Sequence, residues 1–409
     1  MCVRECVMLL RGRRHRVVGA VACVAVCVVC VVVLAVWWGA GDRLASPLHH
    51  HHHHQDVLES INVSKFLESP RPLTLQPHKT LEACGGGSGG GVEVLVVVPS
   101  SPHNLAARSA VREGWGAYLP RSWELVFYVG AVDRASVQER LIRESQTHRD
   151  ITQDPSYPDS YATLTLKTLA LLSWANQACS NARFVLKADD DVFLNIPHLY
   201  ALTKCLDEAM REVYKAPRGQ GKCDGARELV SHYIDAKTHS YESYVIGGYL
   251  YRGVKTDRSS TSKWQLPVAS YAKDTLPNYL SGTAYLLSTN IIPHLLEAAK
   301  HTPVIHLEDV YLTGLVATER LKLRLTNIEG FERFRPRFEG PCVYEGLLTA
   351  HGFTPGELRA ATHSTLGLPK GACDGVLTRA AVRVNRVLTA VFPRLPAAGL
   401  TDVDVNEVI

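Results

Sequence analysis

The feature that most constrains the fold is an unbroken apolar run, rich in valine, at residues 94–98. A strand with one wet face alternates apolar and polar side chains, so an unbroken run predicts a strand buried on both faces, as in a parallel sheet. Residues 125–129 and 184–186 repeat the pattern as a second and a third strand. Helix-like stretches separate or follow these runs at residues 106–115, 136–144 and 160–182. We expect Asp159 or Ser160 to cap the last of them.

Strands that alternate with helices predict a doubly wound α/β sheet flanked by helices. The alternation continues to about residue 330, which predicts one large domain at residues 92–346. An apolar content of 46% is ordinary for a folded protein and excludes a disordered one. Residues 347–409, rich in Ala, Leu and Thr, form an extension of unknown role that either packs on the body or stays separate. Its residues 376–391 show an amphipathic helical pattern.

The amino-terminal region predicts a membrane anchor. Residues 17–38 carry no charge and follow a tail, residues 1–16, that holds five Arg and one Glu and so accounts for the whole formal charge of +4. A helix of this length spans about 33 Å, enough for a bilayer core of ~30 Å. Positive flanks stay cytoplasmic, so the remainder is expected to face a lumen. The alternative is a cleaved signal peptide, but Trp37 and Trp38 make a poor cleavage site.

Residues 39–91 are expected to be a lumenal stem. They hold six consecutive His at 49–54, prolines between 70 and 77, and glycines at 85–91, compositions that do not bury a core. The His run is either native or an expression tag. Asn62 begins the only N-glycosylation sequon, on the lumenal side. The body has no net positive charge, which argues against nucleic acid as a partner.

Six cysteines follow the anchor, and an even number in an oxidising compartment predicts disulfides, with fifteen connectivities left open. The sequence has no CxxC pair among these cysteines, so a zinc site is not predicted. The six are Cys84, Cys179, Cys205, Cys223, Cys342 and Cys373.

Three adjacent acids, Asp189, Asp190 and Asp191, directly follow the strand at 184–186 and a Lys-Ala pair. Ligands of open α/β sheets bind at the carboxyl ends of strands, and adjacent carboxylates repel unless a cation neutralises them. Alternate residues point the same way, so Asp189 and Asp191 are expected to face one ion, with oxygen ligands favouring Mn²⁺ or Mg²⁺. The cluster thus predicts a metal-bridged nucleotide diphosphate, the alternative being a solvated acidic turn. The chain lacks the motifs of kinases, P-loop enzymes, dehydrogenases, zinc proteases and α/β-hydrolases.

Five segments, in order, resemble motifs of the lumenal β-1,3-glycosyltransferases, the family of the β-1,3-galactosyltransferases and β-1,3-N-acetylglucosaminyltransferases. The sequence departs from the family pattern at Gly114 and at Leu280, where many relatives have Cys. The segments are RSAVREGW at 108–115, DSYATLTLKT at 159–168, KADDDVF at 187–193, LPNYLSGTAY at 276–285 and LEDVY at 307–311.

The resemblance implies a GT-A-type mixed sheet, type II topology in the Golgi membrane, a UDP-sugar donor, Mn²⁺ and inversion at the anomeric carbon. It places Asp309 as the base that activates the acceptor hydroxyl, with Glu308 as a substitute or a sugar contact. Helix N-capping is the alternative for these acids. Asp191 is the expected metal ligand, with Asp189 and Asp190 as metal or ribose contacts.

The resemblance also places Arg108, Arg112 and Lys187 near the nucleotide, where cations suit phosphate. The alternative for the two arginines is an i, i+4 pair on a solvated helix face. Lys167 is the only charge within an apolar run and must reach water or an anion, which favours a place near the donor.

Sugar contacts are expected from the segment at 281–283, where Ser281 and Gly282 allow close backbone approach. Tyr279 and Trp264 stack on a sugar face or lie in the core. Trp115 is expected in the core and His306 in a structural role.

The leading hypothesis is therefore a hexosyltransferase, with galactose favoured over N-acetylglucosamine or N-acetylgalactosamine. A non-catalytic chaperone or sugar-binding relative is the alternative from another class, although all four aspartates, 189–191 and 309, are present. A receptor ectodomain fits the topology and leaves the acids unexplained.

Overall fold

A computed structural model describes residues 61–85, 91–211, 223–234, 241–336, 340, 342–368 and 372–373. All of them belong to one unit, His51–Ile409. Across these described ranges, no helix has the length and apolar character needed to cross a membrane. The predicted anchor at 17–38, the His run and the helical pattern at 376–391 lie outside the described residues.

A seven-stranded sheet, in the order β10-β8-β9-β4-β1-β2-β3, forms the centre of the body. β1 pairs in parallel with β2 and β4, and β2 with β3, whereas β9 is antiparallel to both β4 and β8. The sheet is therefore mixed, as the family resemblance implied. Its strands are β1 (Val94–Pro99), β2 (Trp123–Ala131), β3 (Ile151–Pro158), β4 (Phe184–Ala188), β8 (Ile246–Tyr251), β9 (Tyr279–Ser288) and β10 (Thr326–Asn327).

Two smaller sheets complete the strands. β5 (Val192–Leu194) pairs with β11 (Thr349–His351), and β6 (Ser231–Ile234) pairs with β7 (Tyr241–Tyr244), both in antiparallel fashion.

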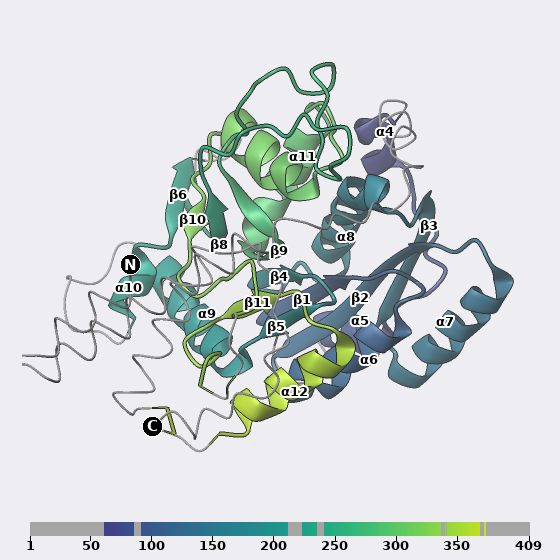
Figure 1. Cartoon of the computed structure of the whole chain (residues 1–409), viewed down its shortest axis with the longest axis vertical. Helices are drawn as coiled ribbons and strands as arrows, with labels where there is room; N and C mark the ends of the chain where they lie inside the picture. Colours follow the sequence, from purple (N-terminus) through teal and green to yellow (C-terminus); the bar gives the residue numbers. More distant parts are fainter. Residues whose placement is uncertain are drawn as a thin grey trace, which may run out of the picture. The chain divides into compact units, whose positions relative to one another are not determined.

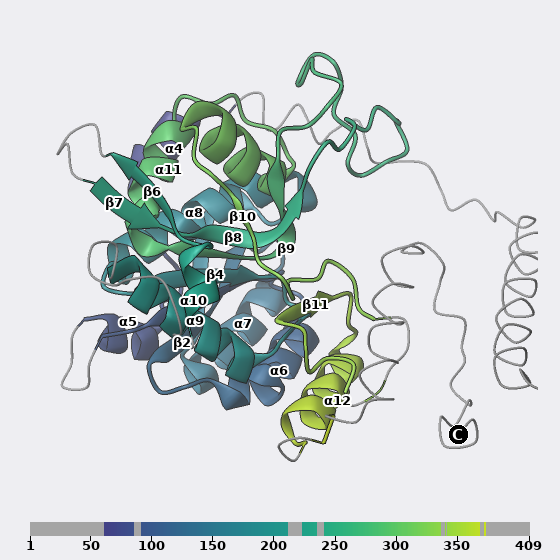
Figure 2. The same cartoon turned by 90° about the vertical axis from the view of Figure 1, so that its left-hand side faces the viewer.

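Helices cover both faces of the large sheet, with α8 and α11 on one side and α6 and α12 on the other (Figures 1 and 2). The described helices are α4 (Val63–Glu68), α5 (His78–Cys84), α6 (Leu105–Glu113), α7 (Ala135–His148), α8 (Leu164–Ala178), α9 (Ile196–Arg211), α10 (Asp224–Arg227), α11 (Ile292–Ala299), the π-helix η4 (Val310–Arg320) and α12 (Pro355–Leu366). Short 3₁₀ turns are η1 (Trp115–Tyr118), η2 (Tyr161–Thr163) and η3 (Thr289–Ile291).

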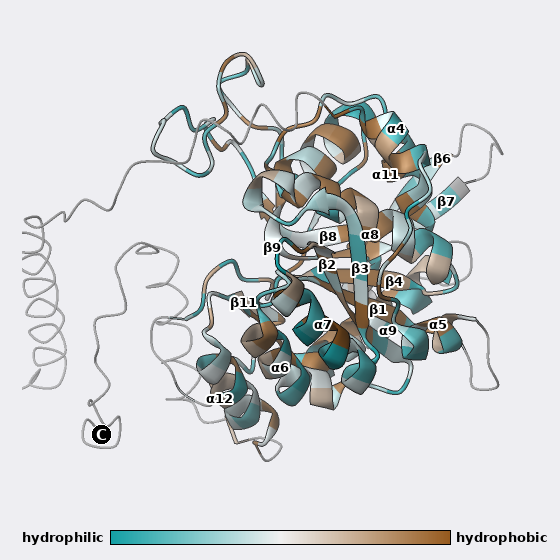
Figure 3. Ribbon diagram, turned by 90° about the vertical axis from the view of Figure 1, so that its right-hand side faces the viewer, coloured by the Kyte–Doolittle hydropathy of each residue, from teal (hydrophilic) through white to brown (hydrophobic). Residues whose placement is uncertain are grey.

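The strand predicted at residues 94–98 is confirmed as β1, and every residue in it is buried. Leu95 and Val97 join the core on the α8 side, and Val94, Val96 and Val98 join the core on the α6 side. Successive side chains of a strand point to opposite faces, so an apolar run without alternation fills both cores at once. Figure 3 shows the contrast with α7, whose ribbon is largely hydrophilic.

Two predictions about neighbouring elements need correction. Phe184 begins the fourth strand rather than the third, because β3 (Ile151–Pro158) had no apolar run to mark it. β3 is an edge strand and contains two prolines, which a strand in the middle of a sheet does not accommodate. The helix predicted at 160–182 is shorter: Ser160 forms a capping box with Thr163 around η2, and α8 itself starts at Leu164 and ends at Ala178.

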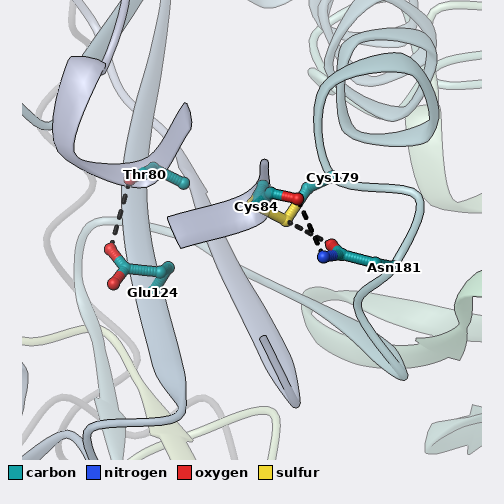
Figure 4. The surroundings of a disulfide bond; sticks show 5 residues. All are labelled: Thr80, Cys84, Glu124, Cys179 and Asn181. Carbon is teal, nitrogen blue, oxygen red and sulfur yellow. Dashed lines mark hydrogen bonds between the residues drawn. A yellow bond between two sulfur atoms is a disulfide. The ribbon is translucent and has the colours of Figure 1, made fainter. Parts of the chain in front are cut away.

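Part of the predicted stem packs on the body. Val63 in α4 and Cys84 in α5 are buried in the core on the α8 side, and Leu75 forms an antiparallel bridge to Gln153 of β3. A disulfide joins Cys84 to Cys179 after α8, and Asn181 Nδ2 donates to the Cys84 carbonyl at 2.8 Å (Figure 4). The covalent link fixes residues 61–85 to this end of α8, while the exact end of the stem stays a prediction.

The expectation that the six cysteines after the anchor form disulfides is confirmed. Besides the first pair, Cys205 joins Cys223 and Cys342 joins Cys373.

The beginning of the carboxyl-terminal extension also packs on the body. Leu347, Ala350, Phe353 and Leu358 lie in the core on the α6 side. Thr354 starts α12 with a capping box in which Glu357 is the third helical residue. Of the two alternatives, packing is the one seen up to residue 368.

Candidate functional site

The three adjacent aspartates lie in the turn between β4 and β5, at the carboxyl end of β4, and Asp190 has different partners from Asp189 and Asp191. Asp190 reaches the loop after β1, where Ser100 Oγ donates to its Oδ2 at 2.6 Å and Asn104 Nδ2 at 3.2 Å. Burial raises the pKa of Asp190, although these two hydrogen bonds oppose the shift. Asp190 therefore links the loop after β4 to the loop after β1, at the carboxyl ends of these two neighbouring strands.

Asp189 and Asp191 meet a third residue that the sequence analysis missed. One ligand atom from each of Asp189, Asp191 and His351 lies within 4.8 Å of the others, and His351 Nε2 is 3.3 Å from Asp191 Oδ2. The pairing of β11 with β5 sets His351 opposite Val192, the residue after the aspartates. Two carboxylates and an imidazole are a donor set that suits a divalent ion such as Mn²⁺. No motif marks His351, since it comes from the extension.

Lys187 of β4 connects this group to a second pair of acids. Its Nζ, in a side chain that is 1% exposed, lies 2.6 Å from Asp189 Oδ1 and 3.7 Å from Glu308 Oε2. It also donates to the carbonyl of Gly282. Burial by itself lowers the pKa of Lys187, but the charges of Asp189 and Glu308 outweigh burial and raise it. We name Lys187, Asp189, Glu308 and Asp309 the Lys187 cluster, in which one cation faces three carboxylates.

Glu308 and Asp309 directly precede η4. Glu308 is buried and accepts a hydrogen bond from Tyr285 Oη at 2.6 Å, and burial raises its pKa to about 7. Asp309 is partly exposed. Its Oδ1 accepts from the Val310 amide at 2.8 Å and its Oδ2 from the Gly282 amide at 2.9 Å, while burial raises its pKa. Asp309 thus caps η4, which was the alternative considered for it, and it also binds the backbone of β9 through Gly282.

Gly282 allows β9 to approach these acids closely. A Cβ at this position would lie 3.2 Å from Glu308 Oε2 and 3.2 Å from Asp309 Oδ2. A larger residue would push the acids away from the strand, so the glycine sets the spacing of the cluster. Ser281, next to it, is buried, with its hydroxyl 3.1 Å from that of Thr283.

Arg108 and Arg112 of α6 pair with acids of the body. Arg108 is fully buried, and its Nε and Nη2 donate to the two carboxylate oxygens of Glu144 at 2.8 and 2.7 Å. Arg112 donates to both oxygens of Asp150 at 2.8 Å. The solvated-face alternative is therefore wrong for Arg108. We name Arg108, Arg112, Glu144 and Asp150 the Arg108 cluster.

Arg108 also contacts the aspartate turn indirectly, through Ser100. Its Nη1 donates to Ser100 Oγ at 3.2 Å and to the Ser101 carbonyl, so it supports the hydroxyl that binds Asp190. Lys167 supports the same loop, with its Nζ 2.8 Å from the Ser100 carbonyl. The anion that Lys167 was expected to meet is Asp159, whose carboxylate oxygens lie 2.9 and 2.7 Å away.

The aromatic residues near the site divide between core and surface. Tyr279 is buried and stacks on Tyr251, with ring centroids 4.9 Å apart. Trp264 is 53% exposed, so the core alternative is wrong for it. Trp115 is confirmed as a core residue. His306 is buried and lies 3.3 Å from the Lys263 carbonyl.

Comparisons with known proteins show the family of the chain. A family model described as Galactosyltransferase matches residues 106–220 and 225–329. The mouse protein Beta-1,3-galactosyltransferase 4 is 30% identical over 313 residues, which cover 74% of this chain and 79% of the relative. The mouse protein Lactosylceramide 1,3-N-acetyl-beta-D-glucosaminyltransferase is 28% identical over 275 residues, 64% of this chain and 63% of the relative.

Among solved structures, the crystal structure of galactosyltransferase LgtC with donor and acceptor sugar analogues matches 68% of this chain and 98% of its own. The identity is 11% and the TM-score 0.31.

The family model and the named relatives define the class as enzymes that transfer a hexose from a sugar donor to a glycan acceptor. The chain belongs to the Galactosyltransferase family and is a hexosyltransferase.

Proposed function

We propose that the chain is a metal-dependent, inverting β-1,3-galactosyltransferase with a GT-A-type site that uses UDP-galactose. One observation carries the proposal: the group Asp189, Asp191 and His351 lies close to the partly exposed Asp309, because Lys187 contacts both Asp189 and Glu308, the residue before Asp309. A site that transfers a sugar needs both parts, one for the charge of the leaving diphosphate and one for the proton of the attacking hydroxyl.

Asp189, Asp191 and His351 would hold Mn²⁺ or Mg²⁺, and the donor set fits because two carboxylates and one imidazole converge there. When bound, such an ion acts as a Lewis acid toward the diphosphate. Asp190, already bound to Ser100 and Asn104, holds the loop after β1 beside the nucleotide. Arg108, Arg112 and Lys167 keep their carboxylate partners in this scheme. Arg108 and Lys167 support that loop, and Arg112 binds Glu144 and Asp150.

Asp309 is the proposed base. Each of its oxygens accepts one backbone N–H and retains a lone pair for the acceptor hydroxyl. Glu308 is more deeply buried and hydrogen-bonded to Tyr285, so its role is to orient Lys187. The acceptor oxygen forms a bond to the anomeric carbon as the bond to the diphosphate oxygen breaks. The electron pair leaves with UDP, the proton passes to Asp309, and one displacement inverts the configuration.

We also propose type II topology in the Golgi membrane, with a cytoplasmic tail (1–16), an anchor (17–38) and a lumenal body. The three disulfides support an oxidising compartment. Transfer of N-acetylglucosamine is the second candidate for the donor, because a relative at 28% identity bears that name.

The test is UDP release by the full-length chain with UDP-galactose, UDP-N-acetylglucosamine and UDP-N-acetylgalactosamine, each with Mn²⁺ or EDTA and a panel of acceptor sugars. Metal-dependent release with UDP-galactose that Asp191→Ala abolishes is the expected result. Asp274→Asn is the matched control, since the Asp274 side chain is fully exposed. Release of UDP only from UDP-N-acetylglucosamine would favour the second candidate. No release from folded protein would favour the non-catalytic relative.

A further inference from the structure

A cation packs against aromatic rings near the end of β8, the strand beyond β9 when the sheet is followed from β4. The Arg333 guanidinium lies 4.9 Å from the ring centroid of Tyr249 and 5.0 Å from those of Tyr251 and Phe334. We name these four residues the Arg333 platform. Phe334 is 37% exposed, and Arg333, Tyr249 and Tyr251 are partly exposed, so the platform is open to solvent.

Tyr279 connects the Arg333 platform to the segment that carries Asp309, the proposed base. Tyr251 ends β8 opposite Tyr279, which begins β9, and their rings stack 4.9 Å apart. The same end of β9 is fixed to η4, because the Leu280 amide donates to Thr313 Oγ1 at 2.9 Å. Asp309 caps η4, so Tyr279 lies about one turn along that helix from the proposed base.

The sheet order gives the platform a direction. From the aspartates after β4, the next strand is β9, which carries Gly282 and contacts Asp309, and then comes β8 with Tyr251 (Figure 2). Adjacent strands lie about 4.8 Å apart, so the platform is about two strands beyond the proposed metal group. A donor held at Asp189 and Asp191 leaves this side of Asp309 to the acceptor.

Among the described residues, the guanidinium of Arg333 differs from those of Arg108 and Arg112 in its partners, which are aromatic rings rather than carboxylates. Within the described part of the chain no carboxylate pairs with Arg333, whereas Arg108 and Arg112 each hold one at 2.8 Å or closer. Its face is covered by rings, and the Tyr251 hydroxyl is its polar neighbour. The edge of a guanidinium carries donors in a fork that matches a carboxylate or a sulfate. Stacking holds that fork in place before a ligand arrives.

We propose that the Arg333 platform is an acceptor-binding site and that the acceptor is a glycan carrying an oxyanion, a carboxylate or a sulfate ester, on a sugar beyond the reacting one. The rings of Tyr249, Tyr251 and Phe334 offer apolar faces to the sugar, and Arg333 binds its anionic group. The inference rests on the proposed function, because it places the acceptor by the position of Asp309.

The test compares matched acceptors with the full-length chain. Disaccharides with the same reacting galactose and a neutral glucose, a glucuronate or a 6-sulfated glucose as second sugar are assayed for kcat and KM by UDP release. The anionic acceptors are expected to have a KM at least about ten-fold lower than the neutral one, with similar kcat. The glucuronate and sulfate arms show which oxyanion is preferred.

Two variants and a control separate recognition from packing. Arg333→Gln is expected to remove the difference in KM between anionic and neutral acceptors, and Arg333→Lys to retain part of it, since a point charge lacks the fork. Arg121→Gln removes an exposed arginine just before the start of β2, away from the site, and should retain the full difference. Equal KM values in the unaltered chain, or a difference that survives in folded Arg333→Gln, would overturn the proposal.

A binding measurement keeps this inference apart from the proposed function. Saturation-transfer NMR with methyl β-glucuronide, galactose 6-sulfate and methyl β-glucoside needs no turnover. If UDP is never released and the anionic sugars still bind through Arg333, the proposed function fails and the platform stands. If neutral acceptors react normally and no anionic sugar is preferred in either assay, the platform assignment alone fails.

Discussion

The Arg108 cluster and the Lys187 cluster each contain a buried cation, Arg108 or Lys187, and they differ in the balance of positive and negative charge. In the Arg108 cluster two arginines meet two carboxylates, Glu144 and Asp150, through five contacts of 2.7 or 2.8 Å. In the Lys187 cluster one cation faces three carboxylates. A balanced group satisfies itself and contributes to the fold, whereas an excess of negative charge raises pKa values and favours binding of a cation or a proton. The residue types alone do not distinguish the two clusters, because both contain cations and carboxylates. The pairing of these charges in the structure distinguishes them.

The largest expected effect is on turnover in the Lys187 cluster. Asp309→Asn removes the proposed base and keeps an acceptor oxygen for only one of the two backbone amides. We therefore expect kcat to fall by about 10²- to 10⁴-fold and the free energy of unfolding to fall by only about 1–3 kcal/mol. UDP release and a melting curve measure the two quantities. Asp274→Asn, the exposed control, should leave both unchanged; equal losses of turnover in the two variants would remove Asp309 from the mechanism.

The next effect is on stability in the Arg108 cluster. Glu144→Gln leaves Arg108 buried without its carboxylate, which should lower the free energy of unfolding by about 3–5 kcal/mol. Glu139→Gln on the same helix, in an exposed pair with Arg143, should cost less than about 0.5 kcal/mol. Urea denaturation provides both values. A specific loss of kcat in Glu144→Gln at full stability would show that the balanced cluster takes part in the chemistry.

The pH dependence of stability should carry the signature of Glu308. Its pKa is about 7 in the folded chain, above the ordinary value of 4.5, so the folded chain holds a proton that the unfolded chain releases between these pH values. Stability from this group is therefore complete below pH ~4.5 and is lost as pH rises through about 7, by on the order of 3 kcal/mol. Denaturation in EDTA at pH 5 and pH 8 should show this loss in the unaltered chain. Glu308→Gln should lack it, and an unchanged slope in that variant would assign the loss to another group.

The smallest of these effects concerns His351. His351→Ala should raise the Mn²⁺ concentration for half-maximal activity by at least about ten-fold, since two carboxylates remain. It should also reduce the Mn²⁺-dependent rise in melting temperature seen with UDP. His363→Ala, an exposed histidine of α12, is the control. Identical metal dependence in the two variants would exclude His351 from the site.

The sequence alone predicted the parts of the fold that depend on local pattern. The unbroken run at β1, the aspartates at the end of β4 and the acids before η4 are each read from neighbouring residues, and the motif resemblance joined them in the right family. β3 escaped because an edge strand with two prolines has no apolar signature.

Long-range partners could not be read in the same way. Nothing in the sequence pairs Glu144 with Arg108, because Glu144 follows a charged surface pattern and becomes buried only when α7 packs beside α6. His351 lies in a segment without a motif and reaches the aspartates only through the β5–β11 pairing. The Arg333 platform likewise joins Tyr249 and Tyr251 of β8 to Arg333 and Phe334, which come from a segment without regular structure after β10.

The β5–β11 pairing has a consequence for biosynthesis. The chain is made from its amino terminus, and elements formed early can fold before the rest emerges. His351 and the strand that carries it are synthesised after every strand of the large sheet. A nascent chain therefore acquires the proposed set of metal-binding side chains only after every strand of the large sheet has been made. Chains that stop short of β11 would carry the family motifs and still lack His351.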